Sequence, residues 1–330
     1  MQAATAGTNV VEVEELARSF GDVQAVRGIS FAVREGEIFG FLGPNGAGKS
    51  TTMKILCTLL PPSSGRAAVA GCDVVRDPMG VRRALGVVFQ DPAVDDLLTA
   101  RENLAVHCMV YRVSRAERRE RVEGALAFAG LVEQGDRLVK TFSGGMRRRL
   151  EIARALLHRP RILFMDEPTS GLDPQTRRRI WKELAELRER DRVTVFMTTH
   201  YIEEAEACDR IAIIDRGKLI AEGSPGELRR GAGNASLSLS TADDARAMVE
   251  LEARFGTAPR RTEAGLEVAL PDGDFMTRLA GFPVSISRLS VHEPTLEDAF
   301  IALTGSAIRS EGAASAHERE QKQRFRGGPR

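Results

Sequence analysis

The sequence predicts an α/β fold followed by a smaller α+β domain. The chain has 330 residues, of which 42% are hydrophobic, and this length suits one large and one small domain. A short apolar run, Ile38–Leu42, leads directly into a glycine-rich segment and then into a helical stretch that ends near Leu59. That order is typical of a buried strand, a tight loop and a helix. A second glycine-rich segment, 231–234, separates the two domains.

The other elements follow from apolar periodicity and from turn residues. In the large domain we expect a mostly helical region over 91–157 and strands over 10–14, 29–33, 162–165, 193–198, 211–215 and 218–222. In the small domain we expect strands over 235–240, 265–270 and 283–289, and helices over 242–255 and 294–303.

These elements predict four regions along the chain. Residues 1–9 form a flexible N-terminus, 10–230 the large domain and 235–305 the accessory domain. The tail, 306–330, is small, polar and charged, and its last 22 residues carry six Lys or Arg against three Glu. This composition predicts a solvated, disordered end, with electrostatic contact to anionic lipid as the alternative.

Composition limits the possible functions. Lys and Arg number 47 against 46 Asp and Glu, so the chain lacks the basic excess of a general nucleic-acid binder. The four cysteines form no CxxC pair, which argues against a zinc site or a disulfide framework and fits a reducing cytosol. The apolar runs are too short to span a bilayer, so we expect a partner to supply any membrane span.

The glycine-rich segment after the first buried strand matches GxxxxGK[ST] in the context that this motif requires. Backbone N–H groups of such a loop bind phosphate oxygens, and the dipole of the following helix adds to the attraction. Lys49 can reach the β and γ phosphates, and the Ser50 hydroxyl can bind Mg²⁺. The predicted nucleotide-binding residues here are Gly43, Pro44, Asn45, Gly46, Ala47, Gly48, Lys49, Ser50 and Thr51.

Two carboxylates follow the predicted strand 162–165. Asp166, at the strand end, is a second ligand for Mg²⁺. Glu167 comes one residue later, so it can face the γ-phosphate and polarise a water molecule. The segment therefore predicts the metal ligand and the general base of a phosphoryl-transfer site.

Ser143, Gly144 and Gly145 indicate a second anion site at the start of a helix. Ser143 lies 94 residues after Lys49 and 23 before Asp166. One chain has no need of two γ-phosphate sites, but a head-to-tail dimer does. In order and spacing, residues 10–228 resemble an ATP-binding cassette (ABC) ATPase. The resemblance implies a P-loop NTPase with a mixed core sheet, an antiparallel β part and a helical subdomain.

Further motifs of that family have counterparts here. Gln90 resembles the Q-loop glutamine, which senses Mg²⁺ and the attacking water and whose loop contacts the membrane partner. Ser170–Asp173 resembles the D-loop, which acts across the dimer and brings Asp173 to the nucleotide. His200 resembles the histidine that contacts the γ-phosphate. Phe20 occupies the place of the aromatic residue that stacks on adenine, usually a tyrosine.

The signature segment resembles one subfamily in particular. The segment 142–150, FSGGMRRRL, and the ending 293–305 resemble the daunorubicin/doxorubicin-resistance ATPases of bacterial exporters. Met146 departs from the usual LSGGQ, since a thioether cannot donate the hydrogen bonds of a glutamine. We interpret Arg147–Arg149 as a solvent-exposed helix face, with stabilisation of transition-state charge across the dimer as the alternative.

The resemblance implies an ATPase that binds ATP and Mg²⁺ and drives a separately encoded permease. Its expected partners are that permease and a second copy of itself, with no nucleic acid, at the cytoplasmic face of the cell membrane. The alternatives are a soluble ABC ATPase acting on ribosomes or nucleic acid, and the ATPase of an importer. A kinase or GTPase would not explain Ser143, Gln90 and His200 together.

Overall fold

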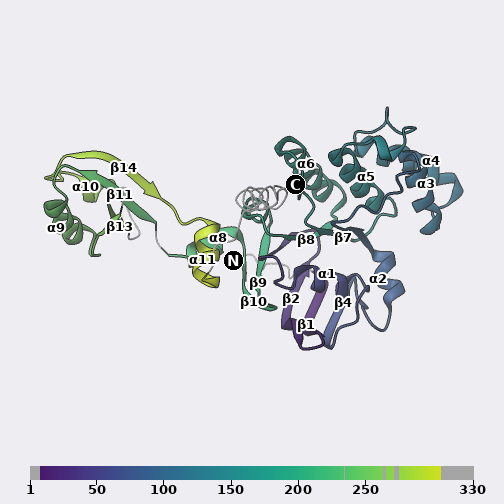
Figure 1. Cartoon of the computed structure of the whole chain (residues 1–330), viewed down its shortest axis with the longest axis horizontal. Helices are drawn as coiled ribbons and strands as arrows, with labels where there is room; N and C mark the ends of the chain where they lie inside the picture. Colours follow the sequence, from purple (N-terminus) through teal and green to yellow (C-terminus); the bar gives the residue numbers. More distant parts are fainter. Residues whose placement is uncertain (1–7, 234, 263–264, 271–274, 306–330) are drawn as a thin grey trace, which may run out of the picture. The chain divides into compact units, whose positions relative to one another are not determined.

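The computed structural model describes residues 8–233, 235–262, 265–270 and 275–305 (Figure 1). The predictions for residues 1–7 and for the tail from 306 lie outside the described residues. The chain forms two compact units, because most contacts between residues fall within one unit or the other. The larger unit ends at Ser224 and the smaller one begins at Pro225. Each unit is described by itself.

A six-stranded sheet forms the centre of the larger unit, in the order β10-β9-β3-β8-β7-β6. Its strands are β3 (Ile38–Leu42), β6 (Leu85–Val88), β7 (Ile162–Asp166), β8 (Thr194–Thr199), β9 (Arg210–Asp215) and β10 (Lys218–Gly223). All pairings are parallel except that of β10 with β9. β3, β7 and β8 are buried throughout, which explains their unbroken apolar runs. Their carboxyl ends share one edge, where ligands of such sheets bind.

An antiparallel sheet packs beside it, in the order β2-β1-β4-β5. Its strands are β1 (Asn9–Phe20), β2 (Val23–Arg34), β4 (Ser64–Val69) and β5 (Cys72–Asp73). β1 and β2 have 12 residues each and extend well beyond the predicted segments. Glu15 has φ 46° where the register of β1 shifts, so a bulge interrupts the alternation on which the shorter prediction relied.

Phenylalanine rings join the two sheets. Phe31 of β2 stacks on Phe39 of β3 with ring centroids 5.7 Å apart, and Phe39 stacks on Phe196 of β8 at the same distance. The helix α1 (Lys49–Leu56) adds Met53, Ile55 and Leu56 to the same core. The first helical turn after the glycine-rich loop is therefore fixed against both sheets.

Helices between β6 and β7 form the predicted helical region (Figure 1). This region has a hydrophobic core of its own. Its helices are α3 (Ala100–Val110), α4 (Arg115–Phe128), the 3₁₀ turn η1 (Val139–Thr141) and α5 (Gly144–Leu156). Elsewhere in the unit lie α2 (Pro78–Ala84), α6 (Pro174–Asp191) and α7 (Ile202–Glu206), none of which the sequence analysis assigns. Within the described residues we find no helix with the length and hydropathy needed to cross a bilayer.

The smaller unit contains a four-stranded antiparallel sheet in the order β12-β13-β11-β14. Its strands are β11 (Ser236–Thr241), β12 (Arg260–Thr262), β13 (Gly265–Ala269) and β14 (Ile286–His292). Its helices are α8 (Pro225–Gly231), α9 (Asp244–Phe255), α10 (Phe275–Leu279) and α11 (Leu296–Thr304). Leu237, Leu239 and Leu251 belong to the core between the sheet and α9. α8 lies in this unit and contacts α11.

Candidate nucleotide-binding site

The loop between β3 and α1 requires glycine at two positions. Gly48 has φ 107°, and a Cβ there would lie 2.5 Å from the carbonyl oxygen of Ala25. A Cβ on Gly43 would lie 2.2 Å from the carbonyl oxygen of Ile214. Gly48 also provides no side-chain cap for α1, so N–H groups of the first helical turn remain available to an anion.

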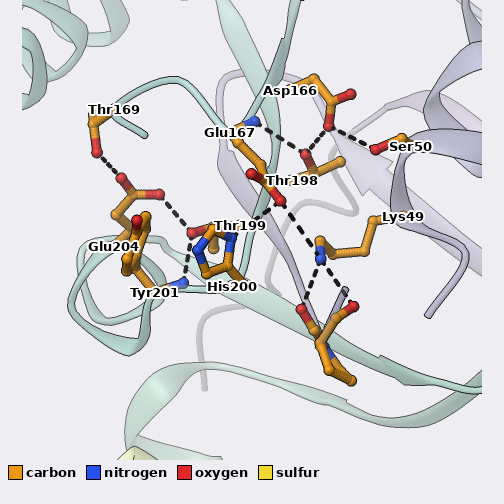
Figure 2. Close-up of polar contacts among 12 residues, drawn as sticks. Lys49, Ser50, Asp166, Glu167, Thr169, Thr198, Thr199, His200, Tyr201 and Glu204 are labelled. Carbon is orange, nitrogen blue, oxygen red and sulfur yellow. Dashed lines mark hydrogen bonds and ion pairs between the residues drawn. The ribbon is translucent and has the colours of Figure 1, made fainter. Parts of the chain in front are cut away.

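Lys49 is buried beneath this loop. Its Nζ donates hydrogen bonds to the carbonyl oxygens of Gly43, at 2.7 Å, and Pro44, at 3.1 Å. It also lies 3.8 Å from Oε1 of Glu167 (Figure 2). Burial lowers the pKa of Lys49, while the charges of Glu167 and Asp166 oppose that shift. The ammonium group is thus held at the loop by oxygen atoms.

A cavity of about 260 Å³ opens at this loop. It is lined by Ala25, Asn45, Gly46, Gly48, Lys49, Ser50, Thr51, Gln90 and Glu167. All of these except Ala25 are predicted site residues. A larger groove, of about 1990 Å³, contains charged side chains of α4 and α6, among them Arg121 and Glu183, but none of the motif residues. We place the candidate site in the smaller cavity because the phosphate-binding chemistry lies there.

Asp166 and Ser50 face one another, as the sequence analysis expects of two ligands for one Mg²⁺. The Ser50 hydroxyl donates to Oδ1 of Asp166 at 3.2 Å, and the Thr198 hydroxyl donates to the same oxygen (Figure 2). Gln90 lines the adjoining cavity. A hydroxyl, a carboxylate and an amide oxygen suit a hard cation such as Mg²⁺. The donor set therefore fits this metal.

Glu167 is held in an unusual backbone conformation at the end of β7. Its φ is 46°, a left-handed value that is strained for a residue with a side chain. Its N–H lies 3.1 Å from the carbonyl oxygen and 3.2 Å from the hydroxyl oxygen of Thr198, both of which accept from it. This anchoring directs the side chain towards Lys49 and His200 (Figure 2), and Glu167 lines the cavity. Such strain, held by neighbouring contacts, is typical of a functional site.

His200 lies beside Glu167 at the end of β8. Its Nδ1 is 3.0 Å from Oε1 of Glu167. The two atoms make a close polar contact, but their geometry does not meet that of a hydrogen bond. This imidazole lowers the pKa of Glu167; burial opposes the shift and Lys49 adds to it. The other ring nitrogen of His200 is buried and has no hydrogen-bond partner among the described residues. His200 can therefore still bond to a ligand.

Glu204, on α7, fixes the segment around His200 and was missed by the sequence analysis. It is buried, and its carboxylate accepts hydrogen bonds from the hydroxyls of Thr199, at 2.5 Å, and Thr169 (Figure 2). The Thr199 hydroxyl in turn accepts from the N–H of Tyr201 at 2.9 Å. Burial raises the pKa of Glu204, and the two threonine hydroxyls oppose that shift. This carboxylate ties the histidine segment to the segment that follows Glu167.

Ser143 and Gly144 lie on the surface, outside the cavity. The Ser143 side chain caps α5 by accepting from the N–H of Met146 at 3.3 Å. A Cβ on Gly145 would lie 2.8 Å from Cγ2 of Thr176, so packing requires glycine there. A Cβ on Gly144 would meet nothing nearer than 4.0 Å, so packing within this chain does not explain that glycine.

The predicted nucleotide contacts Phe20 and Asp173 also lie outside the cavity lining, as do Gly43, Pro44, Ala47 and Gly145. Phe20, at the end of β1, is 45% exposed, and the guanidinium of Arg18 lies 4.7 Å from its ring centroid. Asp173 caps α6 by accepting the N–H groups of Gln175 and Thr176, both at 3.0 Å. Within this single chain, neither Phe20 nor Asp173 forms part of the cavity wall.

The residues after Gly145 have distinct environments. Met146 is half-buried and packs against the core of the helical region, a role that a thioether fills well. Arg148 is only 7% exposed, so its interpretation as part of a solvent-exposed face is wrong. Its contacts are described below.

Known proteins resemble the chain in sequence and in structure. Residues 26–170 match the family described as ABC transporter. The daunorubicin/doxorubicin resistance ATP-binding protein DrrA of Streptomyces peucetius is 38% identical, over 96% of this chain and 99% of that protein. The linearmycin resistance ATP-binding protein LnrL of Bacillus subtilis is 35% identical, over 91% of this chain and 100% of that protein.

A solved structure extends the similarity to the fold. It is the dimeric post-hydrolysis state of the ATP-binding cassette MJ0796 bound to ADP and Pi, with 31% identity and a TM-score of 0.60 over 65% of this chain and 98% of that one. The mixed sheet, the helical region and the ordered motifs agree with this relationship and confirm the predicted fold class. The chain belongs to the family of ABC transporter ATP-binding proteins.

Proposed function

We propose that the chain is the ATP-hydrolysing subunit of a bacterial exporter whose permease is a separate protein. The observation that carries this proposal is the convergence, at one cavity, of Lys49, the Ser50–Asp166 pair and Glu167 beside His200. Relatives named for resistance to daunorubicin, doxorubicin and linearmycin favour efflux of an antibiotic or other secondary metabolite as the role of the complex.

Nucleotide binding begins at the glycine-rich loop. N–H groups of the loop and of the first turn of α1 bind phosphate oxygens, and Lys49 exchanges its carbonyl partners for the β and γ phosphates. Ser50, Gln90 and Asp166 would hold Mg²⁺, which neutralises phosphate charge and withdraws electrons from the γ-phosphorus when bound.

Glu167 then acts as the general base. A carboxylate that remains ionised can accept the proton of a water molecule aimed at the γ-phosphate. The lowered pKa of Glu167 keeps it ionised at neutral pH. The neighbouring buried ring of His200 donates to the γ-phosphate or orients that water, and Glu204 holds the His200 segment in place.

A second copy completes each site. Ser143 and Gly144 are exposed at the start of α5, and Gly144 leaves room for close approach by another molecule. In a head-to-tail dimer they contact the γ-phosphate bound to the partner's loop, with Gly145 and Asp173 beside them. Phe20 stacks on adenine. The dimeric relative bound to ADP and Pi supports this arrangement.

A third surface suits the permease. Leu97, Val106, Met109 and Val110 follow Gln90 in sequence and are exposed by 76%, 43%, 51% and 69%, respectively. Val106, Met109 and Val110 lie on α3 at the i, i+3 and i+4 spacing of one helix face, and exposed apolar side chains on one face mark an interaction site. We propose that the permease docks here and holds the chain at the cytoplasmic face of the membrane, as a peripheral subunit. The sequence analysis assigns residues 10–230 to the cassette and 235–305 to an accessory domain, whereas contacts within the structure place α8, from Pro225, in the smaller unit.

The first test is ATP hydrolysis by the purified chain with Mg²⁺. Lys49→Ala removes the charge that faces the phosphates, so both ATP binding and turnover should fall. Lys54→Ala is the matched control, because Lys54 lies on the same helix but is exposed. Wild-type turnover by Lys49→Ala in a cleanly purified sample would refute the site assignment.

A further inference from the structure

Arg148 and Glu151 form a buried ion pair on the first turns of α5. They are 7% and 2% exposed, and Nη1 of Arg148 lies 3.3 Å from Oε2 of Glu151. The desolvation penalty of two buried charges exceeds the free energy of their attraction unless their remaining hydrogen-bonding groups also have partners. Those partners are backbone groups of two loops of the candidate site.

The guanidinium of Arg148 binds the backbone on both sides of Glu167. Its Nη2 donates to the carbonyl oxygen of Asp166 at 3.1 Å, and its Nε donates to that of Pro168 at 2.7 Å. A planar guanidinium with five N–H groups can make such parallel bonds, whereas an ammonium group acts as a point charge. Hydrogen bonds from the Arg148 side chain therefore hold the backbone immediately before and after Glu167, the proposed base.

The same pair binds the backbone on both sides of Gln90. Nη1 of Arg148 donates to the carbonyl oxygen of Phe89 at 2.5 Å. Oε1 of Glu151 accepts the N–H of Ala93 at 2.6 Å. Two side chains of one helix thus hold the flanks of both reactive loops, and that helix begins at Ser143.

We propose that Arg148 and Glu151 are positioning residues for ATP hydrolysis, which aim Glu167 and link its movement to that of the Gln90 loop. Neither residue reaches the cavity lining. The Gln90 loop directly precedes the surface where we propose that the permease docks. Docking of the permease therefore moves this loop, and the four backbone contacts of Arg148 and Glu151 transmit the movement to Glu167. The inference rests on the proposed function and deepens it.

The decisive variant is Arg148→Met/Glu151→Met. Arg148→Met alone leaves the Glu151 charge buried and unpaired, which destabilises the fold whatever the role of the pair. Replacing both residues by apolar side chains of similar length removes that cost and still deletes all four backbone contacts. We expect thermal unfolding and binding of a fluorescent ATP analogue to stay near wild type, while kcat falls on the order of 10²-fold through misplacement of Glu167.

The matched control is Arg121→Met/Glu117→Met on α4. Arg121 pairs with Glu117 at 3.5 Å and donates to the carbonyl oxygen of Leu157 at 3.0 Å, outside both reactive loops. The kcat of this control double variant should equal that of the wild-type chain. Wild-type kcat in the Arg148/Glu151 double variant would overturn the proposal, as would equal loss of kcat and of ATP binding.

If the double variant fails to fold, Arg148→Lys tests the positioning role instead. Lysine keeps a charge opposite Glu151 but cannot reach three carbonyl oxygens in the same plane. We expect near-wild-type unfolding, a lower kcat and faster amide hydrogen exchange in both 89–93 and 166–167. Faster exchange in only one of these segments would refute the linkage, and full kcat would refute the positioning role. If the wild-type chain fails to hydrolyse ATP, the proposed function itself fails.

Discussion

The Nζ of Lys49 lies 3.8 Å from Oε1 of Glu167, so one ammonium group joins the phosphate-binding loop to the proposed base. His200 lowers the pKa of Glu167 against the effect of burial, and the charge of Lys49 adds to that shift. The two residues lie 118 positions apart and meet because β3 and β7 end at the same edge of one sheet. The lysine proposed to bind phosphate and the proposed general base are therefore electrostatically connected in this chain.

Glu167→Gln should separate the two activities. Glutamine keeps the size and much of the hydrogen bonding of glutamate but cannot accept a proton from water. ATP binding should change little, while turnover falls by about 10²-fold or more, as expected for the loss of a general base. ATP should then hold two copies together, which size-exclusion chromatography with ATP at reduced Mg²⁺ would detect as a dimer. Turnover at the wild-type rate would make Glu167 structural and His200 the next candidate.

Asp166→Asn should behave differently from Glu167→Gln. The Asp166 carboxylate accepts the hydroxyls of Ser50 and Thr198, and it is the proposed charged ligand of Mg²⁺. Removing its charge should weaken the Mg²⁺-dependent part of ATP binding together with turnover. Titration of ATP with and without Mg²⁺ measures that part. An unchanged Mg²⁺ dependence would remove Asp166 from the proposed metal site.

The residues proposed to contact phosphate and metal were predictable because their chemistry fixes both residue type and local spacing. Lys49 and Ser50 must stand at the start of a helix, and Asp166 and Glu167 at the end of a buried strand. Arg148 and Glu204 could not be recognised in this way. Their partners are mainly backbone carbonyls and threonine hydroxyls of distant segments, and a single sequence does not reveal which of these will be adjacent.

The same reasoning explains which parts of the fold were predicted. β3, β7 and β8 are buried on both faces and read as continuous apolar runs, so they were found. The long strands β1 and β2 include bulges and exposed positions that hide their alternation. In the smaller unit, β14 begins and ends three residues after the predicted strand 283–289. Its edge position leaves most of its residues exposed, which weakens the pattern that sets register.

A mixture of two inactive variants should recover activity if the site is shared between copies. Lys49→Ala damages the loop, and Ser143→Arg places a bulky charge on the exposed start of α5. One mixed dimer contains one site damaged at both residues and one intact site. Turnover of the mixture should exceed that of either variant alone, and wild-type specific activity should rise with protein concentration. Strictly concentration-independent activity from a proven monomer would exclude this mechanism.

The exposed apolar side chains after Gln90 predict where the permease binds. Leu97→Asp and Val110→Asp replace side chains that are 76% and 69% exposed, so each should change the free energy of unfolding by no more than about 0.5 kcal/mol. Each places a charge where we expect an apolar contact, and an uncompensated buried charge is costly. When the chain is co-expressed with its permease, recovery in the membrane fraction should therefore fall for both variants. Val249→Asp is the control, since Val249 is 68% exposed on α9 of the smaller unit. Equal recovery of Leu97→Asp, Val110→Asp and wild type would exclude this surface, and the permease contact would then have to lie elsewhere on the chain.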